Sequence, residues 1–369
     1  MAQRLTINYN KKPCYDIVFS KSFDGLGEEL EELELSDRKI CVFTDSDVEP
    51  LYAREILDCI QEKCKKAVVF CFPAGEGNKT LDTVKDAYTF LIREGFDRKD
   101  VLIALGGGVV GDLTGYTAAT YLRGIDFIQI PTTLLAQADS SIGGKTGVDF
   151  DGYKNMVGAF YMPRLVYMNV SVLKTLEERQ FFSGFAEIMK HGLIRDHLFY
   201  EWLLDHMYEI CERNPDVLEE MVMKSSTIKK MVVEKDPTEK GDRALLNFGH
   251  TIGHAIEKAK NFELYHGECV ALGCVAAAYI SWKHELLSME EYYEIRDMFV
   301  PFNLPISVDD IEPEEILHLT KSDKKMDAGR IRFVLLKKVG KAVLDMTVTD
   351  EDILNAVREI YFSDDDKAE

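Results

Sequence analysis

Three histidines and one glutamate are the residues of this sequence best suited to hold a metal ion. His250 and His254 lie four residues apart in the segment GHTIGH, so they share one face of a predicted helix. His266 stands at the start of the next predicted helix, and Glu187 lies on an earlier one. Two neutral imidazoles and a carboxylate form a standard catalytic zinc set that leaves one position for water or substrate. Histidines at this spacing also occur in helices that bind no metal, but the glycine before each of the pair and the histidine at a helix start favour a metal site.

A glycine loop is the second chemical feature. Gly106, Gly108 and Gly111 satisfy the pattern G-x-G-x-x-G directly after a predicted strand and before a helix. Without a Cβ the backbone can approach a pyrophosphate, and the helix start supplies N–H donors. A plain strand-to-helix turn uses glycines too, so the loop alone leaves both readings open. Polar residues after two other predicted strands favour a dinucleotide, because ligands collect at the carboxyl ends of parallel strands. These residues are Asp45, Asp47, Glu76 and Lys79.

Basic and amide side chains form the third feature. They are Arg123, Lys145, Lys154, Asn155, Lys190, Lys229, Arg243, Asn247, Lys324 and Lys325. Because the net charge of the chain is −20, most of them are expected to be solvated surface charges, and Lys229 and Lys325 taken singly are interpreted in this way. Lys145 differs, because it follows two glycines and the polar run 139–141, which is not expected to form a helix face. A glycine-rich turn with a lysine is a good receptor for phosphate or carboxylate. Lys190 follows Glu187 by three residues, so both point to one side of a helix.

The elements that must position these residues change character near residue 172. Before it, strands alternate with helices, which predicts a parallel sheet with crossover helices. After it, nearly every segment has helical periodicity. The predicted strands are 39–44, 67–72, 101–105 and 126–130, with helices at 48–65 and 80–94. The later predicted helices are 177–196, 198–212, 217–233, 249–260, 269–286 and 290–300, with strand-like pieces at 331–336 and 342–348. We therefore expect two domains, 1–172 and 173–369.

Composition restricts the partners. The net charge is −20, and an acidic surface repels nucleic acid and anionic lipid. The eight cysteines form no Cys-x-x-Cys pair and are expected to be reduced thiols. The N-terminal segment lacks the apolar stretch of a signal peptide, and the run 269–280 is too short to span a bilayer. We expect a cytoplasmic protein that binds neither nucleic acid nor membranes.

Eight stretches, in order, resemble the 3-dehydroquinate synthase family of sugar phosphate cyclases. They are LGGGVVGD at 105–112, QIPTTLLA at 129–136, DSSIGGKT at 139–146, KNMVGAF at 154–160, AEIMK at 186–190, LNFGHTIGHA at 246–255, HGE at 266–268 and DKK at 323–325. Several long motifs in family order are far more specific than the loop or the histidines alone. The resemblance implies an N-terminal α/β dinucleotide-binding domain with a parallel sheet, a mainly α-helical C-terminal domain, an active site in the cleft and a homodimer.

The resemblance also implies site residues. It implies one divalent metal ion, zinc or cobalt, on Glu187, His250 and His266. It implies contacts to NAD from Asp45, Gly75, Glu76, Lys79, Gly108, Val109, Val110, Gly111, Asp112, Thr132, Thr133, Lys145, Lys154, Val172 and Thr175. It implies a substrate pocket formed by Arg123, Asp139, Lys145, Asn155, Lys190, Lys229, Arg243, Asn247, His254 and Lys324.

The implied substrate is 3-deoxy-arabino-heptulosonate 7-phosphate, whose phosphate and carboxylate account for a basic island in an acidic chain. The implied reaction oxidises the carbon bearing the C5 hydroxyl with bound NAD, eliminates phosphate, returns the hydride and closes the ring by an intramolecular aldol step. The products are 3-dehydroquinate and phosphate, in the shikimate pathway. Lys145, Asn155 and His254 are then expected to hold phosphate, and Lys190, Lys229 and Arg243 the carboxylate and hydroxyls.

Three other functions remain open from the sequence. Another sugar phosphate cyclase shares the metal and NAD motifs, although Arg243 and Lys324 favour a carboxylate substrate. A metal-dependent polyol dehydrogenase has a similar glycine loop and histidine region, but it releases NADH at each turnover and has less need of Lys145, Lys190 and Lys229. A non-enzymatic nucleotide-binding protein has no use for a glutamate and two histidines around an open position.

Overall fold

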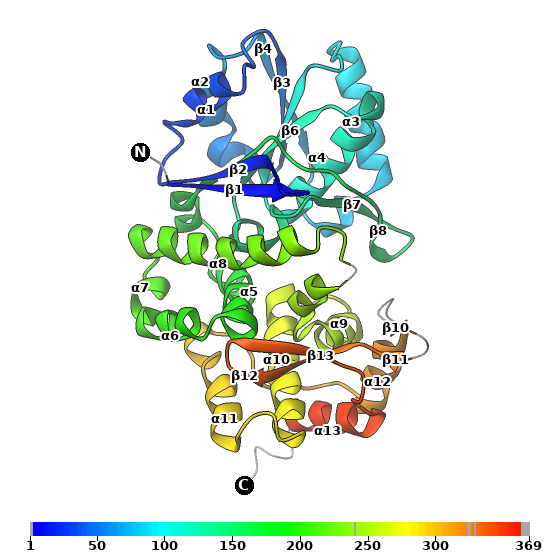
Figure 1. Ribbon diagram of the computed structural model, residues 1–369. Helices are drawn as coiled ribbons and strands as arrows, with labels where there is room; N and C mark the ends of the chain where they lie inside the picture. The colour runs from blue at the N-terminus through cyan, green and yellow to red at the C-terminus, as the bar shows by residue number, and fades with distance from the viewer. Residues whose placement is uncertain (1–2, 240, 323–325, 328–329, 363–369) are drawn as a thin grey trace. The chain divides into compact units, whose positions relative to one another are not determined.

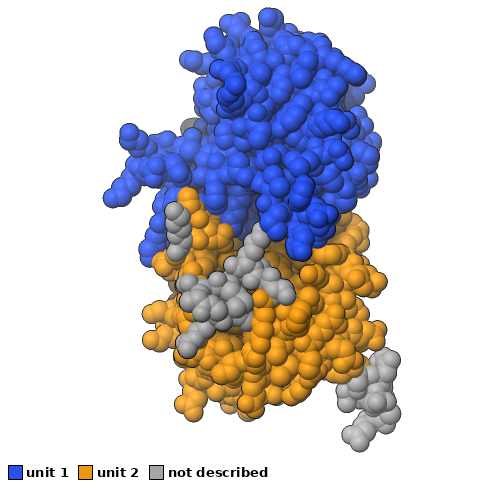
Figure 2. All heavy atoms as spheres, turned by 90° about the vertical axis from the view of Figure 1, so that its right-hand side faces the viewer, with its two compact units in different colours: residues 1–176, 218–237 blue, residues 177–217, 238–369 orange. Residues whose placement is uncertain are grey.

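The computed structural model describes residues 3–239, 241–322, 326–327 and 330–362 of the chain (Figure 1). It contains two compact units, which are coloured separately in Figure 2. Unit 1 consists of Met1–Leu176 and Leu218–Pro237, and unit 2 of Glu177–Val217 and Thr238–Glu369.

The grouping of helix α8 (Pro215–Lys235) corrects the expected boundary. The prediction of one boundary at residue 172 assigned all of α8 to the second domain, whereas most of it belongs to unit 1. Two contacts hold it there: Glu234 accepts hydrogen bonds from the backbone and side chain of Asn8, and Lys229 pairs with Asp139. Helical periodicity shows that a segment has an apolar face, but it does not show which domain that face packs on.

Unit 1 is built on a seven-stranded sheet with the order β1-β2-β9-β6-β5-β3-β4. Neighbours are parallel from β2 to β4, and only β1 is antiparallel to its neighbour, which confirms the predicted parallel sheet. The strands are β1 (Gln3–Tyr9), β2 (Lys12–Ser20), β3 (Lys39–Asp45), β4 (Lys66–Phe72), β5 (Val101–Gly106), β6 (Asp126–Pro131) and β9 (Leu165–Asn169).

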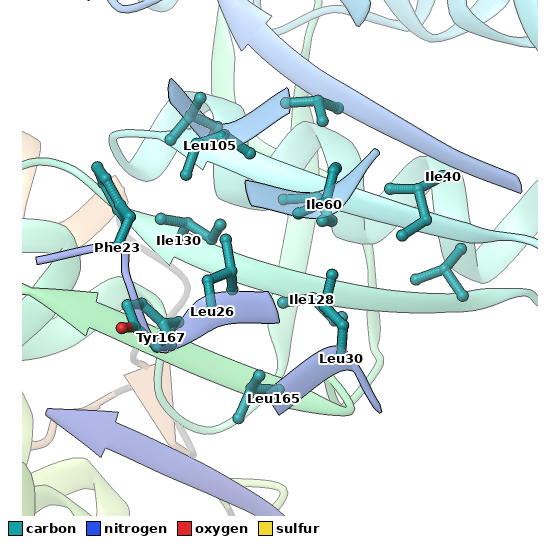
Figure 3. Close-up of a cluster of buried hydrophobic side chains, with 14 of the residues drawn as sticks. Phe23, Leu26, Leu30, Ile40, Ile60, Leu105, Ile128, Ile130, Leu165 and Tyr167 are labelled. Atoms are coloured by element: carbon teal, nitrogen blue, oxygen red, sulfur yellow. The ribbon is translucent and has the colours of Figure 1, made fainter. Parts of the chain in front are cut away.

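Both faces of this sheet are covered, so alternate residues of one strand enter different cores. In β3, Ile40 and Val42 enter one apolar cluster, and Cys41 and Phe43 enter the other. The first cluster, shown in Figure 3, lies between the sheet and helices α1 and α2. The second lies under α3 and α4. The segments that connect the strands are α1 (Leu26–Glu32), η1 (Glu49–Ala53), α2 (Arg54–Ile60), η2 (Glu76–Asn78), α3 (Leu81–Arg93), α4 (Gly108–Thr120), η3 (Tyr121–Arg123), η4 (Ala136–Ser140) and η5 (Val170–Lys174).

The segment around Lys145 differs from the prediction. Lys145 is the first residue of β7 (Lys145–Phe150), which pairs with β8 (Tyr153–Phe160) in a two-stranded hairpin that the sequence did not reveal. The polar run before it lies largely in η4, a π-helical segment. Buried Gln137 holds η4 in place by donating to the carbonyls of Pro131 and Asn169, so polar side chains support a helix here.

Unit 2 is mainly helical, as expected. Its central helix, α10, is buried on nearly all sides, which is typical of a helix that is apolar all round. It packs against α5, α9, α11, α13 and β12. The helices are α5 (Glu178–Arg195), α6 (His197–Asp205), α7 (Met207–Cys211), η6 (Asp242–Asn247), α9 (His250–Ala259), α10 (His266–Lys283), α11 (Met289–Asp297), η7 (Val300–Phe302), α12 (Pro313–Ser322) and α13 (Asp350–Ile360). The short strands are β10 (Met326–Asp327), β11 (Arg330–Ile331), β12 (Phe333–Lys338) and β13 (Lys341–Asp345).

The predicted helix 198–212 is in fact two helices that meet at His206. The ring of His206 stacks on Trp202 with centroids 4.2 Å apart, and its Nδ1 lies 2.9 Å from the Trp202 carbonyl oxygen. Helices α12 and α13 were not predicted as helices.

Candidate active site

The predicted metal ligands meet inside unit 2. Glu187 lies on α5, and His250 and His266 are the first residues of α9 and α10. Glu187 Oε1 is 3.3 Å from His250 Nε2 and 3.4 Å from His266 Nε2. The structure therefore brings together three residues that are separated in sequence by up to 79 positions, with both imidazoles facing one carboxylate oxygen.

Two glycines allow the three helices to meet at this point. Gly249 precedes α9 with a φ of +78°, a left-handed conformation that favours glycine. Gly267 follows His266, and a Cβ there would lie 1.8 Å from the carbonyl oxygen of Ser183 on α5. The amide of Gly267 also donates to Ser183 Oγ at 2.9 Å. The start of α10 is thus fixed against the helix that carries Glu187.

The donor chemistry fits a metal cation. His250 Nδ1 lies 3.1 Å from the carbonyl oxygen of Phe248, which assigns the ring proton to Nδ1 and leaves a lone pair on Nε2. Burial and the nearby Lys190 ammonium lower the pKa of His250 to about 3, so its ring is neutral. Glu187 Oε1 is buried and accepts no hydrogen bond from the residues that the structure describes. A nitrogen lone pair that faces a carboxylate oxygen is favourable only with a cation between them.

Lys190 keeps Glu187 ionised. Burial alone would raise the pKa of this carboxyl group, but the Lys190 ammonium lowers it well below its usual range. Lys190 Nζ donates to Glu187 Oε2, the oxygen that does not face the imidazoles. Both side chains are buried. The pair therefore leaves Oε1 as an anionic ligand atom.

Glu257 is a neighbour of this cluster that the sequence reasoning missed. It is 6% exposed and lies on α9, and its Oε2 is 3.9 Å from His266 Nδ1. Burial opposes a charge on His266, but the carboxylates of Glu187 and Glu257 raise its pKa to about 9. The sequence feature that could have identified Glu257 is its spacing from His254. Glu257 follows His254 by three residues, so the two share one helix face.

The other predicted residues of unit 2 that the structure describes lie close to these helices. The His254 ring centroid is 5.1 Å from that of His250 and 5.7 Å from that of His266. Arg243 is buried in η6, which packs on α5. Asn247 ends η6, and its Nδ2 donates to Glu239 at 3.2 Å. Lys324 lies outside the described residues.

In unit 1, the predicted NAD residues gather at one edge of the sheet. Five neighbouring parallel strands place their carboxyl ends there, so the residues after each strand share an edge. The chain runs from β3 outward to β4 and then returns past β3 to β5, so the strand order reverses between β3 and β5. Ligands of such sheets bind where the order reverses. Residues at or just after these strand ends are Asp45 (β3), Gly75, Glu76 and Lys79 (β4), Gly108, Val109, Val110, Gly111 and Asp112 (β5), Thr132 and Thr133 (β6), and Val172 and Thr175 (β9).

Lys79 joins three segments of this edge. It is 3% exposed, and its Nζ donates to Asp112 Oδ2 at 2.7 Å and to Asn155 Oδ1 at 2.6 Å. These contacts connect η2, the start of α4 and the β7–β8 hairpin. Burial raises the pKa of Asp112, and the Lys79 ammonium acts in the opposite direction. Lys154, beside Asn155 on β8, is exposed.

Asp45 is fixed by its own loop. Its Oδ1 accepts hydrogen bonds from the amides of Asp47 and Val48, both at 3.0 Å. Burial raises the pKa of its carboxyl group. The side chain is held at the end of β3, where a ribose hydroxyl can be bound.

The remaining predicted substrate residues of unit 1 lie in different environments. Lys229 is buried and donates to Asp139, so reading it as a solvated surface charge is wrong; the sequence cannot show that a lysine on a helix faces a buried carboxylate. Lys145 is exposed at the start of β7, and Asn155 is exposed on β8. Arg123 is also exposed, with a φ of +69°.

Comparison with known proteins matches both halves of the chain to one family. The 3-dehydroquinate synthase N-terminal model matches residues 69–183, and the C-terminal model matches residues 184–326. A 3-dehydroquinate synthase of Acetivibrio thermocellus is 43% identical over 96% of this chain and 98% of its own length. One of Ruminiclostridium cellulolyticum is 41% identical with the same coverage.

Solved structures agree with this assignment. A 2-deoxy-scyllo-inosose synthase complexed with carbaglucose-6-phosphate, NAD+ and Co2+ matches with a TM-score of 0.86 and 27% identity over 97% of this chain and 100% of that one. The 2-epi-5-epi-valiolone synthase of Streptomyces hygroscopicus, with NAD+ and Zn2+ bound, matches with a TM-score of 0.87 and 26% sequence identity. The match covers 96% of this chain and 99% of that one. A maleylacetate reductase from Rhizobium, at 18% identity and a TM-score of 0.67 over 96% and 98%, shares the fold alone. With both family models matched along most of its length, the chain belongs to the 3-dehydroquinate synthase family.

Proposed function

We propose that this chain is a lyase that converts 3-deoxy-arabino-heptulosonate 7-phosphate to 3-dehydroquinate and phosphate, with bound NAD and one divalent metal ion. The observation that carries the proposal is the convergence of Glu187, His250 and His266 in a chain that matches the family over residues 69–326. Two relatives that are 43% and 41% identical over 96% of this chain carry this activity in their names.

The cofactors supply chemistry that side chains lack. NAD, if held by the residues at the carboxyl edge of the unit 1 sheet, would supply reversible hydride transfer at C5, which makes the neighbouring proton acidic. A zinc or cobalt ion held by Glu187, His250 and His266 would supply Lewis acidity toward the C5 hydroxyl. Two similar cyclases have been crystallised with NAD+ and one of these metals, which supports the assignment.

The residues of unit 2 hold charge in place for this reaction. Lys190 keeps Glu187 ionised, so the carboxylate would be available as a metal ligand. We assign the substrate carboxylate and hydroxyls to Lys190 and Arg243, whose burial strengthens their attraction for an anion. His254, beside the metal ligands, is assigned to phosphate.

The residues of unit 1 complete the assignment. Asn155 Oδ1 accepts from Lys79, so its amide nitrogen is the part left to donate to phosphate. Exposed Lys145 is assigned to the same phosphate. Lys229, held by Asp139, is assigned to the substrate carboxylate and hydroxyls.

Stoichiometry tests the proposed reaction. Each heptulosonate phosphate consumed should give one phosphate and one dehydroquinate, trace NAD should support many turnovers, and no free NADH should accumulate. One NADH per substrate would instead indicate a dehydrogenase, the activity named for two proteins that share only the fold with this chain. Turnover of a different sugar phosphate in preference would indicate another cyclase.

We further propose that the chain works as a homodimer in the cytoplasm. The β7–β8 hairpin exposes Phe150, Tyr153, Met156 and Phe160, each by 37% or more, and such a group of apolar side chains is typical of an interface. Each of the eight cysteines is a free thiol, as in reducing compartments. Among the described residues, the helices lack the combination of length and apolar character needed to cross a bilayer. Sedimentation of the purified protein, with Phe160→Asp as the variant, tests the dimer.

A further inference from the structure

The two histidines of the metal cluster are oriented by different groups. His250 has its Nδ1 against the main-chain carbonyl of Phe248 at 3.1 Å, which is a neutral acceptor. His266 has its Nδ1 toward the carboxylate of Glu257 at 3.9 Å. Both rings direct Nε2 at Glu187 Oε1. The Nδ1 side of His266 therefore faces a full negative charge, and that of His250 faces only a dipole.

Glu257 is placed by the helix that carries two of the histidines. His250, His254 and Glu257 follow one another at intervals of four and three residues, so they form one stripe along α9. This stripe faces the start of α10, because α9 and α10 pack together. The ring centroids of His250, His254 and His266 lie within 5.7 Å of one another. Glu257 is buried there, although an ionised carboxylate is costly to bury unless it interacts with a cation or a donor.

We propose that Glu257 is a positioning residue for the metal site, which acts through His266. When a metal ion is bound, the negative charge of Glu257 favours the form of His266 that carries the proton on Nδ1 and leaves the lone pair on Nε2 for the ion. It also makes that nitrogen a stronger donor to a divalent cation. At 3.9 Å the contact is longer than a hydrogen bond, so the effect is that of charge. This inference rests on the proposed metal site.

The first test measures metal affinity without substrate or NAD. Zn2+ is titrated into metal-free protein in competition with a fluorescent chelator, and the variants are Glu257→Gln and Glu263→Gln. Both remove one negative charge, but Glu263 is exposed and provides the matched control. Loss of a carboxylate that interacts with a metal-binding histidine, and not with the metal itself, weakens metal binding by about 10-fold to 100-fold. We expect a loss in this range for Glu257→Gln and wild-type affinity for Glu263→Gln.

A spectroscopic readout separates positioning from a structural role. In protein labelled with 15N-histidine and loaded with Zn2+, the nitrogen shifts of His266 should report the Nδ1–H tautomer in the wild type. The Co2+ absorption spectrum should change in Glu257→Gln. Thermal unfolding of the metal-free variants shows whether the fold is intact. If Glu257→Gln is destabilised, the metal affinity of Glu257→Asp, which keeps the negative charge, is measured instead. Retained Zn2+ affinity in Glu257→Asp supports the proposal. A loss of affinity equal to that of Glu257→Gln overturns it.

Two results would overturn the inference in distinguishable ways. Wild-type Zn2+ affinity in folded Glu257→Gln, beside a wild type that binds one ion, would show that the charge of Glu257 is not used and would leave the proposed function intact. A wild-type protein that binds neither Zn2+ nor Co2+ would overturn both this inference and the proposed metal site.

Discussion

Replacing Lys79 by methionine should destabilise unit 1 strongly, because the ammonium of Lys79 holds two segments to η2. Only 4% of its side chain and 19% of that of Asp112 are exposed, and their atoms are 2.7 Å apart. Removing one partner of a buried ion pair costs about 3–5 kcal/mol, and the partial exposure of Asp112 favours the lower end, about 3 kcal/mol. At about 2–4 °C per kcal/mol for a unit of this size, Tm should fall by roughly 6–12 °C.

Thermal unfolding of the metal-free and NAD-free protein measures this effect. Lys99→Met is the control, because Lys99 is exposed in the same unit. In a double-mutant cycle, adding Asp112→Asn should restore part of the lost stability, because it removes the buried carboxylate that Lys79→Met leaves unpaired. A Tm for Lys79→Met equal to that of Lys99→Met, or no recovery in the double variant, would refute the assigned pair.

The pH dependence of the same variant gives a second check with a defined sign. Burial raises the pKa of Asp112, and Lys79 opposes that rise. Without Lys79 the pKa of Asp112 in the folded protein should rise further above its unfolded value. Protonation then favours the folded variant, so the Tm difference from wild type should be full at neutral pH and should shrink as the pH falls through the pKa of Asp112.

Three further outcomes are expected around the metal cluster. Gly267→Ala should lower both Tm and the amount of bound Zn2+, because its Cβ would lie 1.8 Å from the Ser183 carbonyl oxygen; Gly77→Ala, where a Cβ meets no atom within 4 Å, should do neither. Glu187→Gln should reduce Zn2+ affinity by at least about 100-fold in the chelator competition, since it removes an anionic ligand and leaves the Lys190 ammonium without this carboxylate. A strong chelator should abolish phosphate release, and added zinc or cobalt should restore it; full activity of metal-stripped protein would contradict the proposed mechanism.

The sequence predicted best those features that depend on the residue pattern within a single strand or helix. The parallel sheet follows from buried apolar runs that alternate with helices, and its carboxyl edge follows from the ends of those runs. The histidine stripe of α9 follows from helical spacing alone. Glu187 could be named as a candidate ligand from its residue type, and the family resemblance supported it. Spacing alone could not place it, because its distance from His250 depends on how α5 packs against other helices.

The sequence did not predict features that depend on contacts between residues far apart in the chain. Lys229 reads as a surface charge until Asp139 is placed opposite it. The polar run 139–141 was not expected to form a helix face, yet most of it lies in η4, where Gln137 donates to main-chain carbonyls inside the protein. Glu257 has the signature of an ordinary charged helix residue, and only its burial beside His266 distinguishes it.

The position of α8 in unit 1 has a consequence for the order in which the chain can fold. Because unit 1 takes residues 1–176 and 218–237, its chain is interrupted by a segment of unit 2. During synthesis, the sheet is complete when Asn169 has emerged, yet the partner of Asn8 on β1 is Glu234, which emerges later. Domains generally fold as units while the chain grows from its N-terminus. Here the surface of unit 1 that receives α8 stays uncovered until residues 218–237, which follow a segment of unit 2, have left the ribosome.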